Sequence, residues 1–307
     1  MTPSARLNRS AALASIVVAT TLVALKGWAA WSTGSTAMLG SLADTALDLV
    51  ASMVTLVGVS IAAQPDDAAH RFGHGKAEAL AAIVQVTLIA ASALALAVRA
   101  VERYEAGERT AAAGEGITVS LVAIGLTVAL LMWQRHVIRR TGSVAIATDH
   151  VHYQSDLLLN LGVIAALALD QYAGIAGADP VLGFAIAVWL GHGAWRASQG
   201  AVDQLMDKEW PEEKKARFVA VLARHPELRG VHDLRTRTSG DRDFVQFHVW
   251  VDPAMTLGDA HRIMDEVEAR LAAEFPNTEI IIHPEPEGLM DQHGLAAEEV
   301  LPQETHS

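Results

Sequence analysis

Six long apolar segments fill the first two thirds of this chain and constrain its fold more than any other feature. A helix that crosses a membrane needs about 20 mostly apolar residues, and six stretches of the 307-residue sequence approach or exceed that length. The third is the cleanest, because no charged residue lies between Ala79 and Val98. We therefore expect a membrane all-α six-helix transmembrane domain over residues 1–206, with helices at about 9–31, 37–63, 77–101, 115–138, 143–169 and 179–203.

The first segment could instead be a signal peptide, because Arg6 and Arg9 precede an apolar run. The run from Ala11 to Trp31 is longer than an ordinary signal core and leads directly into the next apolar segment. We interpret it as the first transmembrane helix.

Basic residues gather on one side of the expected helices. Cytoplasmic loops of membrane proteins carry an excess of Lys and Arg, so both termini are expected in the cytoplasm. The residues on that side are Arg6, Arg9, Arg71, Lys76, Arg135, Arg139, Arg140 and Lys208.

The last third of the chain is rich in charge and has a different pattern. Residues 207–288 read as helix, strand, strand, helix and strand, at about Pro211–Ala223, Val231–Thr238, Phe244–Val251, Asp259–Phe275 and Thr278–Ile282. This α-β-β-α-β order predicts an α+β cytoplasmic domain, a small sheet with helices on one face. Residues 289–307 are expected to form a flexible acidic tail.

The composition limits the chemistry. The net charge of −12 argues against nucleic acid as a partner. The sequence has no cysteine, which excludes disulfides and thiolate metal sites, so any metal must be held by imidazole and carboxylate groups. Its 13 histidines are an ample supply.

Two pairs of ionisable residues lie inside predicted membrane helices. Asp44 and Asp48 are four residues apart on the second helix, and His152 and Asp156 repeat that spacing on the fifth. Ionisable groups in a membrane are costly and usually mark an ion path. Three carboxylates and one imidazole suit a tetrahedral Zn²⁺ site, although these groups could also simply satisfy one another in a polar bundle core.

Two further sets of possible ligands lie outside the membrane segments. Asp67, His70 and His74 fall within eight residues between the second and third helices, where Gly73 and Gly75 allow a tight turn. The cytoplasmic domain carries the second set on separate elements: His232, His248, His261, His283 and Glu285. His248 alternates with Phe247 and Val249 on its strand, so it is expected to point away from the core.

These motifs together resemble a known family. Asp44-x-x-x-Asp48, the His-Tyr-Gln-Ser-Asp run at 152–156 and the His-x-Phe-Gly-His-Gly-Lys-Ala-Glu run at 70–78 are similar to those of the cation diffusion facilitators, in particular the bacterial zinc and ferrous-iron efflux branch. The resemblance extends from about residue 6 to residue 288.

The resemblance implies a homodimer in a bacterial inner membrane, with a metallochaperone-like (ferredoxin-like) cytoplasmic fold. It implies a transport site at Asp44, Asp48, His152 and Asp156, a loop site at Asp67, His70 and His74, and a binuclear zinc cluster at His232, His248, His261, His283 and position 285. The family has Asp at that last position, where this chain has Glu285. Lys76 and Asp207 correspond to a charge interlock between protomers, and Val151 stands where relatives carry a bulkier Leu in a hydrophobic gate.

We therefore expect a transporter rather than an enzyme. It would export a divalent transition metal, Zn²⁺ first and Fe²⁺, Cd²⁺ or Co²⁺ as alternatives, in exchange for protons, and Zn²⁺ would also have a structural or regulatory role. A membrane metalloenzyme would require a general base beside an open metal position, and a transporter of organic cations would move its substrate without metal. A membrane-anchored metal sensor or scaffold would use the cytoplasmic histidines alone.

Overall fold

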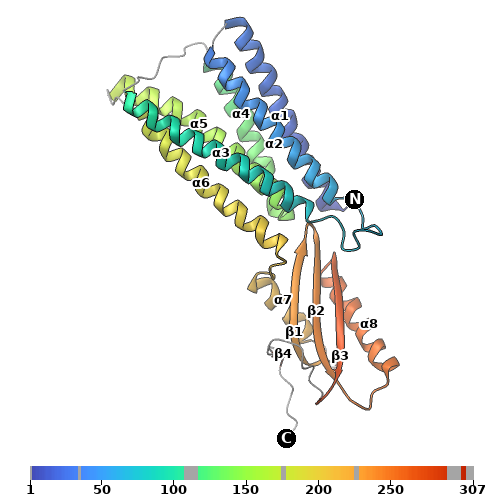
Figure 1. The fold of residues 1–307 in the computed structure, drawn as a ribbon. Helices are drawn as coiled ribbons and strands as arrows, with labels where there is room; N and C mark the ends of the chain where they lie inside the picture. Colours follow the sequence, from blue (N-terminus) through green and yellow to red (C-terminus); the bar gives the residue numbers. More distant parts are fainter. Residues whose placement is uncertain are drawn as a thin grey trace. The chain divides into compact units, whose positions relative to one another are not determined.

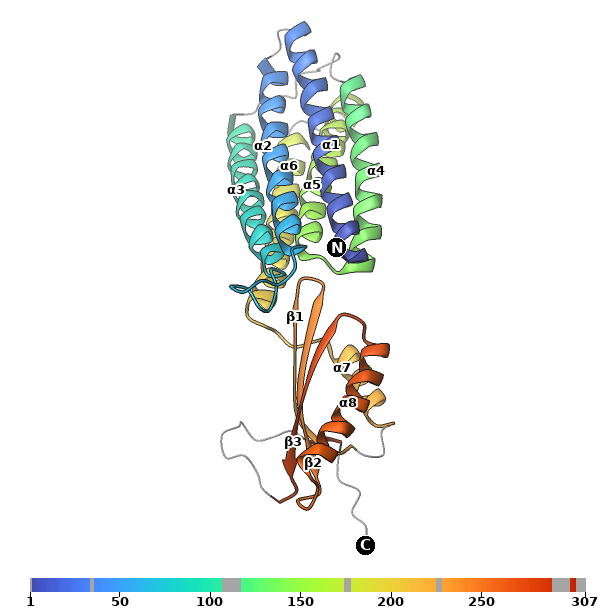
Figure 2. The ribbon, with the colours of Figure 1, turned by 90° about the vertical axis from the view of Figure 1, so that its right-hand side faces the viewer.

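The chain folds into two compact units that divide between Asp203 and Gln204. The structure, a computed structural model, describes residues 2–33, 36–106, 117–173, 178–224, 228–288 and 299–301. The first unit consists of six long helices that run side by side (Figures 1 and 2). They are α1 (Pro3–Thr33), α2 (Thr36–Ala62), α3 (Ala77–Ala106), α4 (Ile117–Thr141), α5 (Val144–Ala173) and α6 (Ala178–Leu205).

The first four helices are long and apolar enough to cross a membrane by length and composition. Within the described residues, the qualifying stretches are Pro3–Ser32, Ser41–Ala62, Ala77–Ala106 and Leu121–Thr141. Helices α5 and α6 complete the bundle, and their sequences are interrupted by ionisable residues such as Asp156 and Arg196. These six helices form the transmembrane domain.

Local signals set the helix ends. Pro3 suits the first position of α1, where a backbone N–H has no partner within the helix, and Thr2 Oγ1 accepts a hydrogen bond from the Ala5 N–H at 3.1 Å. Gly142 follows the end of α4 with a positive φ of 67°, which favours glycine. Ser143 then caps α5, because its Oγ accepts from the Ile146 N–H at 3.3 Å.

The six helices pack through small and branched side chains. Helices α1, α2, α4 and α5 share a cluster that includes Ala11, Val59, Val137 and Ile146. Helices α3 and α6 share a second cluster: Ile89 and Ala93 of α3 with Leu190 and Ala194 of α6. Helix α3 also packs along α2 and α5, so it connects the two clusters.

The second unit is a four-stranded sheet with two helices. Its elements are α7 (Glu212–Leu222), β1 (Arg229–Ser239), β2 (Arg242–Val251), α8 (Leu257–Glu274), β3 (Thr278–Pro286) and β4 (Glu299–Leu301). The strand order is β3-β2-β1-β4, with β2 and β3 parallel and the other pairs antiparallel. The α-β-β-α-β order and the α+β fold class expected from the sequence are confirmed.

The fourth strand corrects one expectation. Glu299–Leu301 lies in the segment expected to be a flexible tail, yet it pairs with β1, Val231 opposite Leu301. The expectation is wrong for these three residues because β1 offers backbone groups at the edge of the sheet, and hydrogen-bonding partners stabilise a strand there. The rest of the segment lies outside the described residues.

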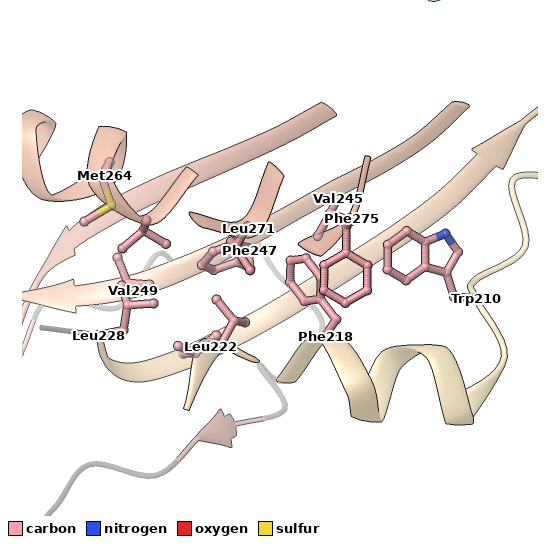
Figure 3. Close-up of a cluster of buried hydrophobic side chains, with 12 residues drawn as sticks. Trp210, Phe218, Leu222, Leu228, Val245, Phe247, Val249, Met264, Leu271 and Phe275 are labelled. Atoms are coloured by element: carbon pink, nitrogen blue, oxygen red, sulfur yellow. The ribbon is translucent and has the colours of Figure 1, made fainter. Parts of the chain in front are cut away.

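Helices α7 and α8 cover the same face of the sheet, and the core lies between these helices and that face (Figure 3). Val245, Phe247 and Val249 of β2 are at most 1% exposed there. The alternation expected from the sequence is therefore confirmed, and His248 lies on the opposite face. Phe218 of α7 packs edge-on against Phe247 and Trp210, at ring-centroid distances of 6.0 and 5.9 Å.

We predict that Phe218→Ala destabilises the cytoplasmic unit by about 3–5 kcal/mol, because it removes a fully buried ring and leaves a cavity. Thermal unfolding of the purified full-length protein would measure the loss. Arg217→Ala, at the exposed neighbouring position of α7, is the matched control and should change stability by less than about 0.5 kcal/mol. Equal effects from the two variants would contradict this core assignment.

Candidate metal sites

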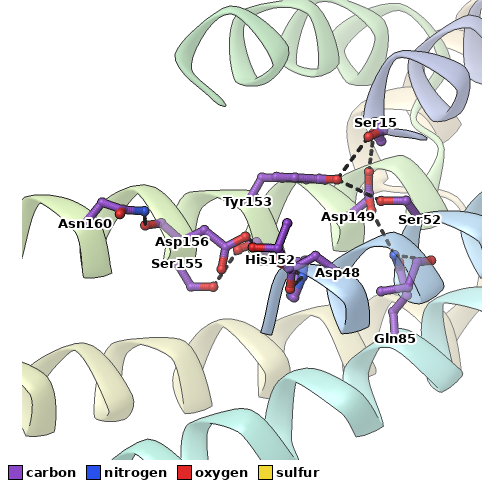
Figure 4. Close-up of polar contacts among 12 residues, drawn as sticks. Ser15, Asp48, Ser52, Gln85, Asp149, His152, Tyr153, Ser155, Asp156 and Asn160 are labelled. Carbon is purple, nitrogen blue, oxygen red and sulfur yellow. Dashed lines mark hydrogen bonds and ion pairs between the residues drawn. The ribbon is translucent and has the colours of Figure 1, made fainter. Parts of the chain in front are cut away.

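Three ionisable side chains from two helices converge inside the transmembrane unit (Figure 4). Asp48 of α2 faces His152 and Asp156 of α5, and their ligand atoms all lie within 4.8 Å of one another. His152 Nε2 lies 2.9 Å from Asp48 Oδ1 and 4.0 Å from Asp156 Oδ2. We refer to Asp48, His152 and Asp156 as the membrane site. Two carboxylates repel each other unless a cation neutralises them, so this donor set fits a divalent metal.

Asp44 is the predicted ligand that does not join this group among the described residues. Its side chain is exposed, whereas the neighbouring Thr45 is buried and accepts a hydrogen bond from Lys26 Nζ at 2.6 Å. Asp44 lies one helical turn before Asp48, and its position along α2 places it outside the group that Asp48 forms with His152 and Asp156. Its role as a fourth ligand stays a prediction.

Polar residues that the sequence analysis missed lie beside the membrane site. Tyr153, 1% exposed, forms a 2.8 Å hydrogen bond with Ser52 of α2 and donates to the Ser15 carbonyl of α1 at 3.2 Å. Asp149 is completely buried one turn before His152. The signal for both was their helical spacing, because positions 149, 152, 153 and 156 lie on one side of α5.

The loop between α2 and α3 brings all three of its predicted ligands together. Asp67 Oδ1 lies 3.3 Å from His70 Nδ1, and Asp67 Oδ2 lies 3.4 Å from His74 Nε2. Gly73 has a φ of 76°, which lets the chain turn between the two histidines. His74 Nδ1 is buried without a hydrogen-bond partner within the described part of the chain. The donor chemistry of this loop site fits a cation.

Backbone amides stabilise the charge of the loop carboxylate. Asp67 Oδ1 accepts hydrogen bonds from the backbone N–H groups of His70, at 2.7 Å, and Ala69, at 2.8 Å. These bonds hold the pKa of Asp67 below its ordinary value. Asp67 is thus ready to act as an anionic ligand at any pH above that lowered pKa.

The cytoplasmic unit contains a third group, formed by His232, His248 and Glu285. Glu285 is 5% exposed, and its two oxygens face different histidines: Oε1 lies 2.7 Å from His248 Nδ1, and Oε2 lies 3.3 Å from His232 Nε2. His283 Nε2 lies farther out, 3.8 Å from Glu285 Oε1. The Glu285 side chain therefore reaches both histidines.

His261 does not join this cytoplasmic group within the described residues. It lies on α8 with a largely exposed side chain, and its Nε2 is 3.6 Å from Asp265 one turn later. Helix α8 covers the core face of the sheet, whereas His232 and His248 pair across β1 and β2 on the other side. The assignment of His261 as a ligand stays a prediction.

Irregular strand geometry orients His232. Strand β1 shifts register on both sides of His232, and Gly230 and Asp233 have positive φ values of 56° and 49°. The Gly230 carbonyl lies 2.8 Å from His232 Nδ1, which leaves Nε2 free toward Glu285. The Trp250 indole stacks on the imidazole at 4.3 Å. A Cβ at residue 230 would lie 1.9 Å from that indole, so this packing requires glycine.

The residues of the predicted interlock and gate have other neighbours within their own units. Asp207 Oδ1 lies 3.6 Å from Arg237 Nη1 in the cytoplasmic unit, and Lys76 belongs to the transmembrane unit. Val151 of α5 packs closely on α6, since a Cβ at Gly193 would lie 2.9 Å from Val151 Cγ1. The contact between protomers and the gate remain predictions.

A helical membrane unit with converging acidic and imidazole groups and a separate α+β unit are consistent with a cation-transporting membrane protein, and comparison with known proteins identifies the family. Residues 12–206 match the cation efflux transmembrane domain, and residues 210–287 match the cytoplasmic domain of cation efflux proteins. The chain belongs to the cation diffusion facilitator family.

Several named relatives are similar over nearly the whole chain. The cation-efflux pump FieF of Cronobacter sakazakii is 40% identical over 281 residues, which cover 92% of this chain and 93% of that protein. The FieF of Pectobacterium atrosepticum is 40% identical over 282 residues, covering 92% and 94%. Among solved structures, the metal-bound C-terminal domain of the CzcD transporter from Thermotoga maritima is 26% identical, covering 27% of this chain and all of that one, with a TM-score of 0.25.

We predict that Asp67→Asn weakens metal binding to the loop site by the same factor at pH 5.5 and pH 7.5. The lowered pKa keeps Asp67 ionised at both, so the substitution removes one negative charge at each pH. Any stability that this carboxylate contributes is likewise present across this range and is lost only as the pH falls through the lowered pKa.

The measurement is Zn²⁺ titration calorimetry of full-length protein that also carries Asp156→Ala and Glu285→Ala, so that the loop site dominates binding. Asp66→Asn, at the preceding position, is the control for loss of charge alone. The prediction would be contradicted if Asp67→Asn lowered the Zn²⁺ affinity less at pH 5.5 than at pH 7.5. That result would mean that Asp67 becomes protonated between these two pH values and that the backbone hydrogen bonds do not lower its pKa.

Proposed function

We propose that this protein exports a divalent transition metal, Zn²⁺ as the leading candidate, from the cytoplasm across a bacterial inner membrane in exchange for protons. It works as a homodimer with both termini in the cytoplasm, and the membrane site opens alternately to the two sides. The observation that carries the proposal is the convergence of Asp48, His152 and Asp156 inside a helical membrane unit. The FieF relatives, which are cation-efflux pumps, support the same direction of transport.

The donor set favours a transition metal. The imidazole nitrogen suits Zn²⁺ and Fe²⁺, whereas carboxylates also accept harder divalent cations, so the mixed set fits Zn²⁺ and also admits Fe²⁺, Co²⁺ and Cd²⁺. Asp44, one turn from Asp48 on α2, completes the proposed tetrahedral set when the two helices turn relative to each other. The first choice of Zn²⁺ rests on this mixed oxygen and nitrogen coordination.

Proton exchange follows from the same ligands. A carboxylate or imidazole must lose its proton before it coordinates a metal, so protons and metal compete for the membrane site. Imidazole changes charge between pH 5 and pH 8 under ordinary conditions, which makes His152 the proposed proton carrier. Moving one proton inward down the membrane potential releases about 2.3 kcal/mol per 100 mV. This free energy favours release of the metal on the outer side of the membrane.

The cytoplasmic unit has a proposed regulatory role. Metal bound by His232, His248 and Glu285, with His261 and His283 as further ligands, would draw the two cytoplasmic units of the dimer together. Lys76 and Asp207 are proposed to interlock the protomers. The match of residues 210–287 to the cytoplasmic domain of cation efflux proteins supports this arrangement.

A second candidate function is a membrane-anchored metal sensor or scaffold. The cytoplasmic group of His232, His248 and Glu285 favours it, since this group alone would let the protein bind metal. A sensor would have no need for Asp48 and Asp156 within the membrane helices, where each ionised side chain costs about 2.5–3.5 kcal/mol on insertion scales.

We predict that Asp156→Ala and Asp48→Ala abolish Zn²⁺ uptake into proteoliposomes under an imposed pH gradient, while leaving dimerisation and folding intact. Each substitution removes one of three converging ligands without opening the helix packing around it. The assay compares Zn²⁺, Fe²⁺, Cd²⁺ and Mn²⁺ in wild type and variants. Glu102→Ala, which removes an exposed acid from the last turns of α3, is the control and should transport normally.

Wild-type flux of Zn²⁺ that depends on the pH gradient and disappears in both variants would support the transporter. If the wild type moves no metal but binds it, the sensor becomes the leading function. If the variants transport as well as the wild type, the intramembrane carboxylates are structural and the membrane site is wrongly assigned.

A further inference from the structure

Asp149 of α5 is a fully buried acid that none of the three metal sites uses. Its relative exposure is 0%. Burying an ionised carboxylate without compensation is very costly, so such a group is expected to be held by several donors. The donors that hold Asp149 come from three other helices.

Each oxygen of the Asp149 carboxylate is held from a different side (Figure 4). Oδ2 accepts a hydrogen bond from Ser15 Oγ of α1 at 2.6 Å and one from Gln134 Nε2 of α4 at 2.8 Å. Oδ1 accepts a hydrogen bond from Gln85 Nε2 of α3 at 3.0 Å. All three donors are neutral side chains.

The contact with Gln85 joins α5 to α3, the helix that carries the cluster shared with α6. Asp149 belongs with α1, α2, α4 and α5, whereas Gln85 lies on α3, one turn before Ile89, which packs on α6. Gln85 is 1% exposed, and its Nε2 also reaches Thr55 Oγ1 of α2 at 2.5 Å. Its Oε1 is buried without a hydrogen-bond partner among the described residues. Buried acceptors without a hydrogen bond are uncommon in folded proteins. The Gln85 amide thus keeps its hydrogen bonds to Asp149 and Thr55 although its own oxygen is left unpaired among the described residues.

Asp149 also lies on the side of α5 that carries the metal ligands. Seven residues separate Asp149 from Asp156, close to two full turns, and three separate it from His152. A shift or rotation of α5 at Asp149 would therefore be transmitted to both ligands. Tyr153 adds contacts to α1 and α2 in the same region.

We propose that Asp149 is a positioning residue of the membrane site, and that its hydrogen bond to Gln85 sets the rotation and height of α5 relative to α3. This bond keeps His152 and Asp156 facing Asp48 in the state seen here. The inference rests on the proposed transport function, and it adds a residue that acts through the ligands rather than on the metal.

Two near-isosteric variants test the proposal in full-length protein that carries Glu285→Ala and His74→Ala, so that Zn²⁺ binding reports the membrane site. Asp149→Asn removes the charge and at least one accepted hydrogen bond. Gln85→Met removes the link to α3 and leaves Asp149 and its other donors in place. We expect each to weaken Zn²⁺ binding by about 10–100-fold, the range for lost support of a metal ligand, and to raise the KM for uptake more than it lowers the maximal rate.

Rescue distinguishes positioning from general stability. The double variant Asp149→Asn with Gln85→Glu exchanges carboxylate and amide across the same contact, and it should recover most of the lost affinity. Gln199→Met, an exposed glutamine of α6, is the matched control and should bind Zn²⁺ normally. Thermal unfolding is measured for every variant.

The outcomes separate this inference from the proposed function. If Gln85→Met folds and binds Zn²⁺ with wild-type affinity, the positioning role is wrong, whatever happens to Asp149→Asn. The same conclusion follows if both variants lose only thermal stability. If the wild type itself shows no Zn²⁺ binding that depends on Asp48 and Asp156, the proposed function fails, and the positioning role fails with it.

Discussion

The cost of placing charge inside a membrane governs how this protein is built. An ionisable side chain in the hydrocarbon region must find a partner or lose its charge, and the transmembrane unit meets that requirement in two different ways. Asp149 is surrounded by three neutral donors from α1, α3 and α4 and is closed to ligands. Asp48 and Asp156 share a single imidazole between them, which leaves carboxylate oxygens available to a cation. The first arrangement holds helices together, and the second is suited to binding and release.

The cytoplasmic unit separates stability from binding by using the two faces of one sheet. The face covered by α7 and α8 holds an aromatic core around Phe218 and Phe247, which requires no metal to pack. The opposite face presents His232, His248 and Glu285. Because the side chains of a strand alternate, Phe247 and His248 serve these separate roles from adjacent positions. The register shifts of β1 and the glycine at 230 then direct His232 toward Glu285.

Membership of the cation diffusion facilitator family accounts for the shared architecture, while local differences give this chain its own character. Glu285 stands where the family resemblance implies Asp, and its two oxygens reach histidines on two strands. Trp250 covers one face of His232 and rests on Gly230, a packing that depends on a glycine with a left-handed conformation. These features leave His232 and Glu285 buried, whereas Asp67 and His70 of the loop site are exposed.

The sequence by itself determined the helical membrane unit, the α+β unit and the residue types of the three candidate metal sites. Apolar length, the alternation of β2 and the spacing of His152 and Asp156 depend only on local periodicity, which is a property of the sequence. The tertiary structure decided which of those residues meet. Among the described residues, Asp48 joins His152 and Asp156, whereas Asp44, one turn earlier on α2, does not. Asp149 was missed because its partners lie 15, 64 and 134 positions away along the chain, and only the packing of four helices brings Ser15, Gln85 and Gln134 around one carboxylate.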